Sequence, residues 1–167
     1  MRAVRPAVVV FVLLSIAALP AWARGNISHF IEQVSCDSGP FALKLPKSYA
    51  ELRKLGPLKA ERVVREEDLG GYKARYKDLL FNGLRLGVVT YTNDPQRYQV
   101  VSAEIRSSQW RIAPFRPGQA LPARLGDVDT KTLSASATHE FSGEEDTLRV
   151  QLRHRRIIVL TYLCVAD

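Results

Sequence analysis

The sequence predicts an α+β fold, an antiparallel β-sheet with short helices on one face. Beyond residue 60, short runs of alternating apolar and polar residues lie between turn residues, a pattern typical of strands. A helix-capping pattern precedes the first of these runs. Related motifs also recur in the two halves, which predicts two tandem helix–β-hairpin repeats. The 167 residues are enough for one compact domain overall.

Residues 1–23 have the layout of a secretory signal peptide. Arg2 and Arg5 precede an apolar run from Ala7 to Leu19, and Ala21-Trp22-Ala23 is a small-residue cleavage site. The alternative is a membrane anchor, but the run is shorter than the roughly 20 apolar residues of a spanning helix. We therefore expect cleavage after Ala23, no membrane span, and a periplasmic or secreted mature protein.

Charge narrows the classes of partner. Without residues 1–23 the chain has 22 basic and 17 acidic residues, a net charge of about +5. Outside the cytoplasm, this moderate and dispersed charge makes nucleic acid a poor partner and favours an anionic surface or an acidic protein face. The alternative is that the charge serves solubility alone.

Cys36 and Cys164 are the two cysteines of the chain. An oxidising compartment predicts one disulfide between them. The alternative is a reactive or metal-bound thiol.

The elements follow in order after an N-terminal arm, residues 24–45. Ser48 as N-cap and Glu51 three residues later predict a helix from Tyr49 to Leu55 that ends at Gly56-Pro57. Asn82-Gly83 between apolar residues predicts a tight hairpin. The alternating runs predict strands near residues 62–65, 72–77, 84–91, 98–105, 131–141, 148–153 and 157–164.

The predicted repeats cover residues 46–106 and 107–167. Leu55-Gly56 recurs as Leu125-Gly126, and Val88-Val89-Thr90-Tyr91 recurs as Val159-Leu160-Thr161-Tyr162 at nearly the same offset. Chance matching of common strand residues is the alternative to a duplication.

A helix that ends in Leu-Gly and leads into a hairpin resembles the module of small envelope proteins of the SmpA/BamE type. Two such modules in tandem over Pro46–Tyr162 resemble the β-lactamase inhibitory protein architecture. This resemblance implies a curved antiparallel sheet with helices on one face and protein binding on the open face.

Catalytic motifs are absent from the sequence. Its three histidines stand in no arrangement typical of nucleophilic catalysis or a metal site, so we expect no enzyme and no cofactor. The alternative is a small envelope hydrolase that uses Asp127 and Asp129.

The sequence therefore predicts an exported, non-enzymatic protein that holds or occludes a partner protein in the cell envelope. Trp110 is either a core residue or an exposed hot spot. Tyr72, Tyr76 and Tyr98 are either core residues or the aromatic floor of a binding face. The basic run at 153–156 is either a solvated hairpin tip or a contact to an acidic partner, an anionic lipid or a glycan. The predicted contact residues are Trp110, Tyr72, Tyr76, Arg153, Arg155 and Arg156.

Overall fold

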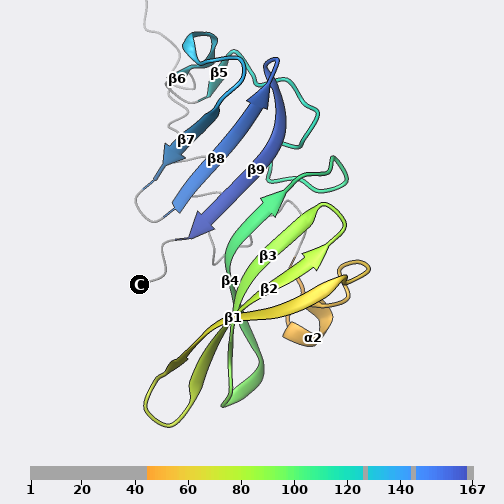
Figure 1. Ribbon diagram of the computed structural model, residues 1–167, viewed down its shortest axis with the longest axis vertical. Coiled ribbons are helices and arrows are strands. Elements are labelled where there is room, and N and C mark those ends of the chain that lie inside the picture. Colours follow the sequence, from red (N-terminus) through yellow and green to blue (C-terminus); the bar gives the residue numbers. More distant parts are fainter. Residues whose placement is uncertain (1–44, 126–127, 144–145, 165–167) are drawn as a thin grey trace, which may run out of the picture.

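A seven-stranded antiparallel sheet dominates the molecule. The computed structural model describes residues 45–125, 128–143 and 146–164. The sheet has the strand order β1-β2-β3-β4-β9-β8-β7, and β5 and β6 form a separate two-stranded ribbon (Figure 1). The strands are β1 Ala60–Asp68, β2 Lys73–Phe81, β3 Leu84–Tyr91, β4 Asp94–Ile105, β5 Arg124–Leu125, β6 Val128–Asp129, β7 Thr138–Ser142, β8 Asp146–Arg153 and β9 Arg156–Cys164.

Two neighbouring rows of residues show how the sheet divides into a covered and an open face. One row crosses six strands through residues that are at most 6% exposed: Leu79, Leu86, Ala103, Tyr162, Leu148 and Phe141. The row beside it on the same strands is largely polar: Leu80, Arg85, Glu104, Thr161, Arg149 and Glu140. Because successive side chains of a strand point to opposite faces, the first row marks the covered face and the second row the open face.

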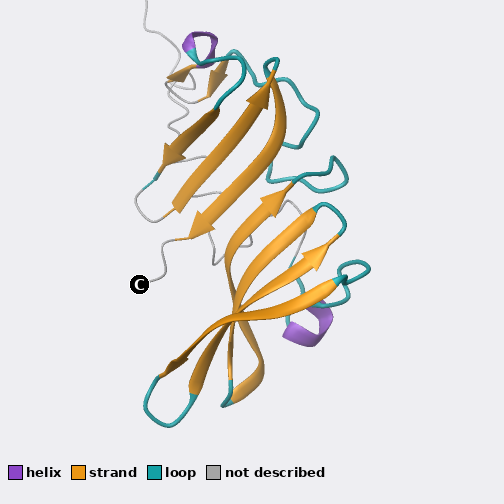
Figure 2. Cartoon of the chain, viewed as in Figure 1, coloured by secondary structure: helices purple, strands orange, loops and turns teal. Residues whose placement is uncertain are grey.

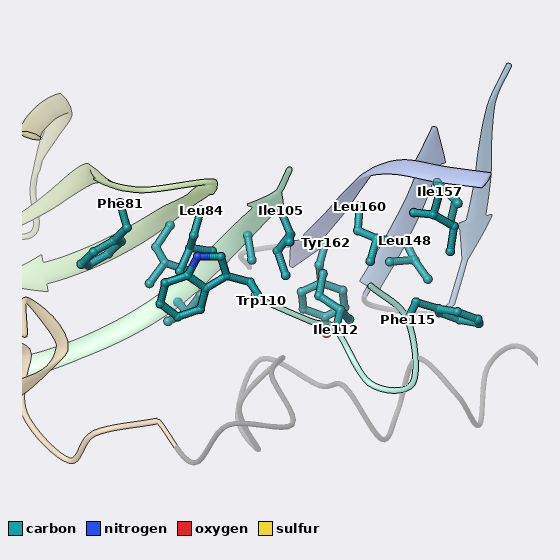
Figure 3. Close-up of a cluster of buried hydrophobic side chains, with 14 of the residues drawn as sticks. Phe81, Leu84, Ile105, Trp110, Ile112, Phe115, Leu148, Ile157, Leu160 and Tyr162 are labelled. Atoms are coloured by element: carbon teal, nitrogen blue, oxygen red, sulfur yellow. The ribbon is translucent and has the colours of Figure 1, made fainter. Parts of the chain in front are cut away.

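Of the described residues outside the sheet, those in the connection between β4 and β7 supply most of the cover. Trp110, Ile112 and Phe115 from this connection lie against strand residues such as Ile105 and Tyr162 (Figure 3). Helix α2, Tyr49–Leu52, adds Tyr49 and Leu52 to the same core. Among the described residues, the core therefore consists of one sheet face, one turn of helix and an irregular connection.

The predicted α+β class is wrong, because the described part of the chain is almost entirely β (Figure 2). Ser48 does cap α2, since its side chain accepts a hydrogen bond from the Glu51 amide. The helix nevertheless ends at Leu52 rather than Leu55. Four residues cannot cover a sheet face, and an isolated turn of helix depends on packing for its stability.

The second predicted helix–hairpin repeat also lacks its helix. Residues 119–125 contain β5 and no helical turn, and Pro122 interrupts the segment. The two recurrent Thr-Tyr motifs do lie in strands, β3 and β9. These strands occupy different positions in the sheet, third and fifth in its order, so the duplication stays a prediction.

Strand prediction was more successful than helix prediction. The expected strand 84–91 is β3, and the hairpin at Asn82-Gly83 is confirmed by the pairing of Phe81 with Leu84. The expected strand 131–141 is wrong in its first half, where a 3-10 turn occupies Thr130–Thr132 before β7 begins at Thr138. The N-terminal arm, residues 24–45, falls almost wholly outside the described residues.

Candidate functional site

Trp110 is a core residue rather than an exposed hot spot. Only 9% of it is exposed, and its ring lies 6.3 Å from that of Phe81. Its indole N–H donates a hydrogen bond of 2.8 Å to the carbonyl oxygen of Asn82 in the β2–β3 turn. Trp110 therefore anchors the β4–β7 connection to the sheet.

The basic run forms the β8–β9 hairpin tip, as predicted, but two of its arginines bind their own chain. Arg155 donates to the carbonyl oxygen of Thr130 at 2.9 Å, and Arg156 donates to that of Gly118 at 2.9 Å. Arg153 is exposed on β8. Two of the three predicted cationic contacts are thus used to hold neighbouring loops.

Tyr72 and Tyr76 lie at the opposite end of the sheet from that tip. We call this region the distal end and define it as residues 62–76 and 89–99, the tips of the β1–β2 and β3–β4 hairpins. Figure 1 shows both tips projecting together beyond α2, away from β7–β9. The structure therefore does not bring the predicted tyrosines and arginines together.

A third tyrosine, Tyr91, completes an aromatic cluster on the open face. Its ring centre lies 6.4 Å from that of Tyr72, and Tyr91 pairs directly with Ala74 across β2 and β3. Tyr76 pairs with Val89 in the same ladder. Ala74 and Val89 are buried but do not belong to the main core cluster, so the tyrosines shield a small apolar cluster of their own.

Arginine side chains lie over two of these rings. The guanidinium carbon of Arg65 is 3.9 Å from the centre of the Tyr76 ring, and that of Arg97 is 4.8 Å from the centre of the Tyr91 ring. We call the five residues Tyr72, Tyr76, Tyr91, Arg65 and Arg97 the tyrosine face. Sequence reasoning missed Tyr91, Arg65 and Arg97, because only the strand register places them beside Tyr72 and Tyr76.

Exposed apolar residues gather at the same end. Among the described residues, the large hydrophobic side chains classed as exposed are Val63, Val64 and Leu69, all in β1 or the turn after it. Val63 and Val64 lie at an irregularity in the β1–β2 register. An edge strand with such side chains is a site where another protein can bind.

The covered side of the distal end has a different composition. Lys73, Arg75 and Lys77 alternate along β2 and line two adjoining hollows that share Arg75 and Thr92. The first hollow, of about 250 Å³, is also lined by Tyr49, Thr90, Tyr91 and Pro95. The second, of about 460 Å³, is also lined by Asp68, Gly71 and Tyr72. We call these two hollows the basic groove, and its cations lie on the opposite side of β2 from Tyr76.

A hydrogen-bonded cluster closes the inner end of the groove. Lys77 Nζ and the Tyr49 hydroxyl each donate to Glu61 Oε1 at 2.8 Å, and Arg53 contacts Glu61 Oε2 at 2.9 Å. Desolvation works to raise the pKa of Glu61, but hydrogen bonds from Lys77 and Tyr49 outweigh it, so that pKa is lowered. Burial raises the pKa of Tyr49 and of Tyr98 above the ordinary range.

The residues considered for catalysis have local structural contacts. The Asp129 side chain accepts a hydrogen bond of 2.9 Å from the Lys131 amide, and His139 Nε2 lies 2.9 Å from the Ser134 carbonyl oxygen. Asp127 lies outside the described residues. Within the described segments, no cluster of three or more His, Cys, Asp or Glu side chains could hold a metal ion.

Cys164 ends β9 and is disulfide-bonded. Its Sγ atom lies 3.4 Å from the Val100 carbonyl oxygen of β4. The predicted partner, Cys36, lies outside the described residues, so the pairing stays a prediction.

Comparisons with known proteins do not assign a family. No family model matches the chain, and no curated protein matches it significantly by sequence. One solved structure that it resembles is an extracellular protein containing an SCP domain from Bacillus anthracis str. Ames, at 16% identity and a TM-score of 0.31. The match covers 79% of this chain and 48% of that one, so the chain spans about half the length of the structure it matches. Across residues 45–125, 128–143 and 146–164, no helix is long and apolar enough to cross a membrane.

Proposed function

We propose that this chain is an exported, non-enzymatic binding protein that holds or occludes a partner protein in the cell envelope through the tyrosine face. The observation that carries the proposal is the concentration of three tyrosines and two arginines on the open side of the distal end. Tyr and Arg are enriched in protein interfaces and in their energetic hot spots.

The arrangement of these side chains supports the same proposal. Tyr91 and Tyr76 lie across β2 and β3 from buried Ala74 and Val89, and the Tyr72 ring lies 6.4 Å from that of Tyr91. Rings in such a cluster lose little side-chain entropy when a partner binds. The guanidinium groups of Arg65 and Arg97 add positive charge next to the rings, which favours a partner with an acidic face. The nearby exposed residues Val63, Val64 and Leu69 extend the apolar area.

The test is capture of a partner by the mature chain from an envelope extract of the organism that makes it, followed by affinity measurement with the purified partner. Tyr76→Ala should weaken binding by roughly 30-fold, as expected of a hot-spot residue worth about 2 kcal/mol. Arg124→Ala, an exposed change in β5 at the other end of the molecule, is the control and should leave affinity unchanged. A partner that binds both variants equally, or no saturable partner at all, would contradict the proposal.

Export is a separate part of the proposal, supported by the layout of residues 1–23. N-terminal sequencing of the protein from the periplasm or the medium should begin at Arg24. A product that retains Met1 and stays with the cytoplasmic fraction would contradict it.

A further inference from the structure

We infer that the basic groove binds an oxyanion group, a carboxylate or a phosphate, with Arg75 as its principal ligand. The cations of the groove lie on the opposite side of β2 from Tyr76, because Arg75 and Tyr76 are successive residues of one strand. The groove adjoins the tyrosine face, since Tyr91 lines one hollow and Tyr72 the other. The inference goes beyond the proposed partner-binding function, because it concerns a small oxyanion bound by Arg75 and not a protein bound through Tyr76.

The charge that faces the two hollows is predominantly positive. Three cations, Lys73, Arg75 and Lys77, line them, and the acidic lining residue is Asp68. One oxygen of Asp68 already accepts a hydrogen bond from the Gly70 amide at 3.0 Å. An anion in the groove would therefore meet more positive than negative charge at short range.

Each carboxylate that pairs with these cations contacts two basic side chains. Glu66 lies 2.7 Å from Arg75 Nε and 3.6 Å from Lys73 Nζ. Glu61 is likewise shared by Lys77 and Arg53. Neither glutamate is among the residues that line the hollows, so a ligand there would meet the cations and not their glutamate partners.

Hydrogen-bond donors remain for a ligand. Arg75 contacts Glu66 through Nε, and a guanidinium has four further N–H groups on its terminal nitrogens. Lys77 donates to Glu61 and, at 3.4 Å, to the Tyr49 hydroxyl, and an ammonium group has a third N–H. The Thr92 hydroxyl accepts a hydrogen bond from the Lys73 amide at 2.8 Å, and its own hydrogen can be donated. The planar fork of arginine suits the two oxygens of a carboxylate or phosphate.

The groove also has apolar walls. Tyr49 and Pro95 line the smaller hollow beside the cations. Arg75 has a half-exposed side chain, so water competes for it and the affinity for a small free anion should be weak. The fitting ligand is therefore an oxyanion attached to an apolar or ring-shaped group, for which phosphate and acetate are minimal probes.

The experiment titrates the mature full chain with inorganic phosphate, and in a second arm with acetate, while amide NMR shifts are followed at constant ionic strength. We expect saturable shifts at the amides of Lys73, Arg75 and Thr92. If phosphate alone saturates, the site prefers phosphate, and if both saturate, it takes either oxyanion. Shifts that stay linear for both anions, or that centre elsewhere on the chain, would overturn the inference.

Three variants separate a built site from diffuse attraction. Arg75→Gln should weaken binding by about tenfold, the loss expected for a charge-assisted hydrogen bond. Arg124→Gln removes the same charge from an exposed position in β5, at the other end of the molecule (Figure 1), and should change the affinity by less than twofold. Equal weakening in both variants would overturn the inference. Arg75→Lys keeps the charge and the pairing with Glu66, so it covers the case in which Arg75→Gln fails to fold, and unchanged affinity in Arg75→Lys would overturn the assignment of the arginine fork.

Discussion

The covered part of the sheet and the distal end belong to the same strands but are stabilised differently. Under the β4–β7 connection, residues such as Tyr162 and Leu160 are fully buried in one continuous core. At the distal end, Lys73, Arg75 and Glu66 form exposed ion pairs, and tyrosines cover a two-residue apolar cluster. Burial is worth several kcal/mol per large side chain, whereas exposed ion pairs are worth little. The distal end can therefore vary its side chains for binding at small cost to the fold.

The largest contrast should come from removing one aromatic ring in each region. Phe115→Ala in the covered part should lower the free energy of unfolding by about 3–5 kcal/mol, since Phe115 is only 2% exposed. Tyr76→Ala at the distal end should cost less than about 1.5 kcal/mol, because its ring is already partly in water. Urea denaturation followed by circular dichroism measures both. Equal losses would show that the distal end belongs to the same cooperative core.

Two turn glycines provide the next contrast. Gly83, in the β2–β3 turn under Trp110, has φ +71°, and an added Cβ would lie 2.3 Å from Cβ of Ser107. Gly83→Ala should therefore cost about 2–4 kcal/mol, from left-handed strain and overpacking together. Gly70 at the distal end has φ +75° but no atom within 4 Å of an added Cβ, so Gly70→Ala should cost only about 1 kcal/mol. Thermal or urea unfolding of the two variants measures both losses of stability. A larger loss in Gly70→Ala than in Gly83→Ala would contradict the contrast.

These contrasts also explain which features could be predicted from the sequence. The turn at Asn82-Gly83 and the alternation in β3 are local, so neighbouring residues were enough to predict them. The pairing of β4 with β9 joins residues more than 50 positions apart, and no local pattern encodes it. Trp110 lies in an irregular connection, where spacing says nothing about burial. The helix that begins at Tyr49 is shorter than predicted, because the N-cap at Ser48 marks only where a helix begins. Packing decides where the helix ends.

Replacing a glutamate next to the core should lower the free energy of unfolding more than replacing a glutamate at the distal end. Glu61 accepts hydrogen bonds from Tyr49 and Lys77 beneath α2, so Glu61→Gln should cost about 1–2 kcal/mol at pH 7. Glu66 is paired in a more exposed position, and Glu66→Gln should cost less than about 0.5 kcal/mol.

Acid titration gives a second readout for Glu61. Its lowered pKa in the folded chain means that its stabilisation is complete above the ordinary glutamate pKa of about 4.5 and is lost as the pH falls through the lower folded-state value. The unmodified chain should therefore lose more stability than Glu61→Gln between about pH 4.5 and the acid transition. Unfolding free energies measured across this range would contradict the assignment if the two curves ran parallel.

The smallest expected effect is at the hairpin tip of the covered half. His154 and Arg155 have φ of +50° and +59°, in the left-handed region of backbone conformation. For residues other than Gly, Asn and Asp, this conformation lowers stability by about 1 kcal/mol or more. The corresponding β2–β3 turn has Asn82 and Gly83 instead, the residue pair that suits such hairpins. His154→Asn should therefore stabilise the chain by about 0.5–1 kcal/mol, while Arg155 keeps its hydrogen bond to Thr130. A rise in the urea midpoint at unchanged slope would bear this out, and a fall would mean that the His154 side chain contributes more than its backbone strain costs.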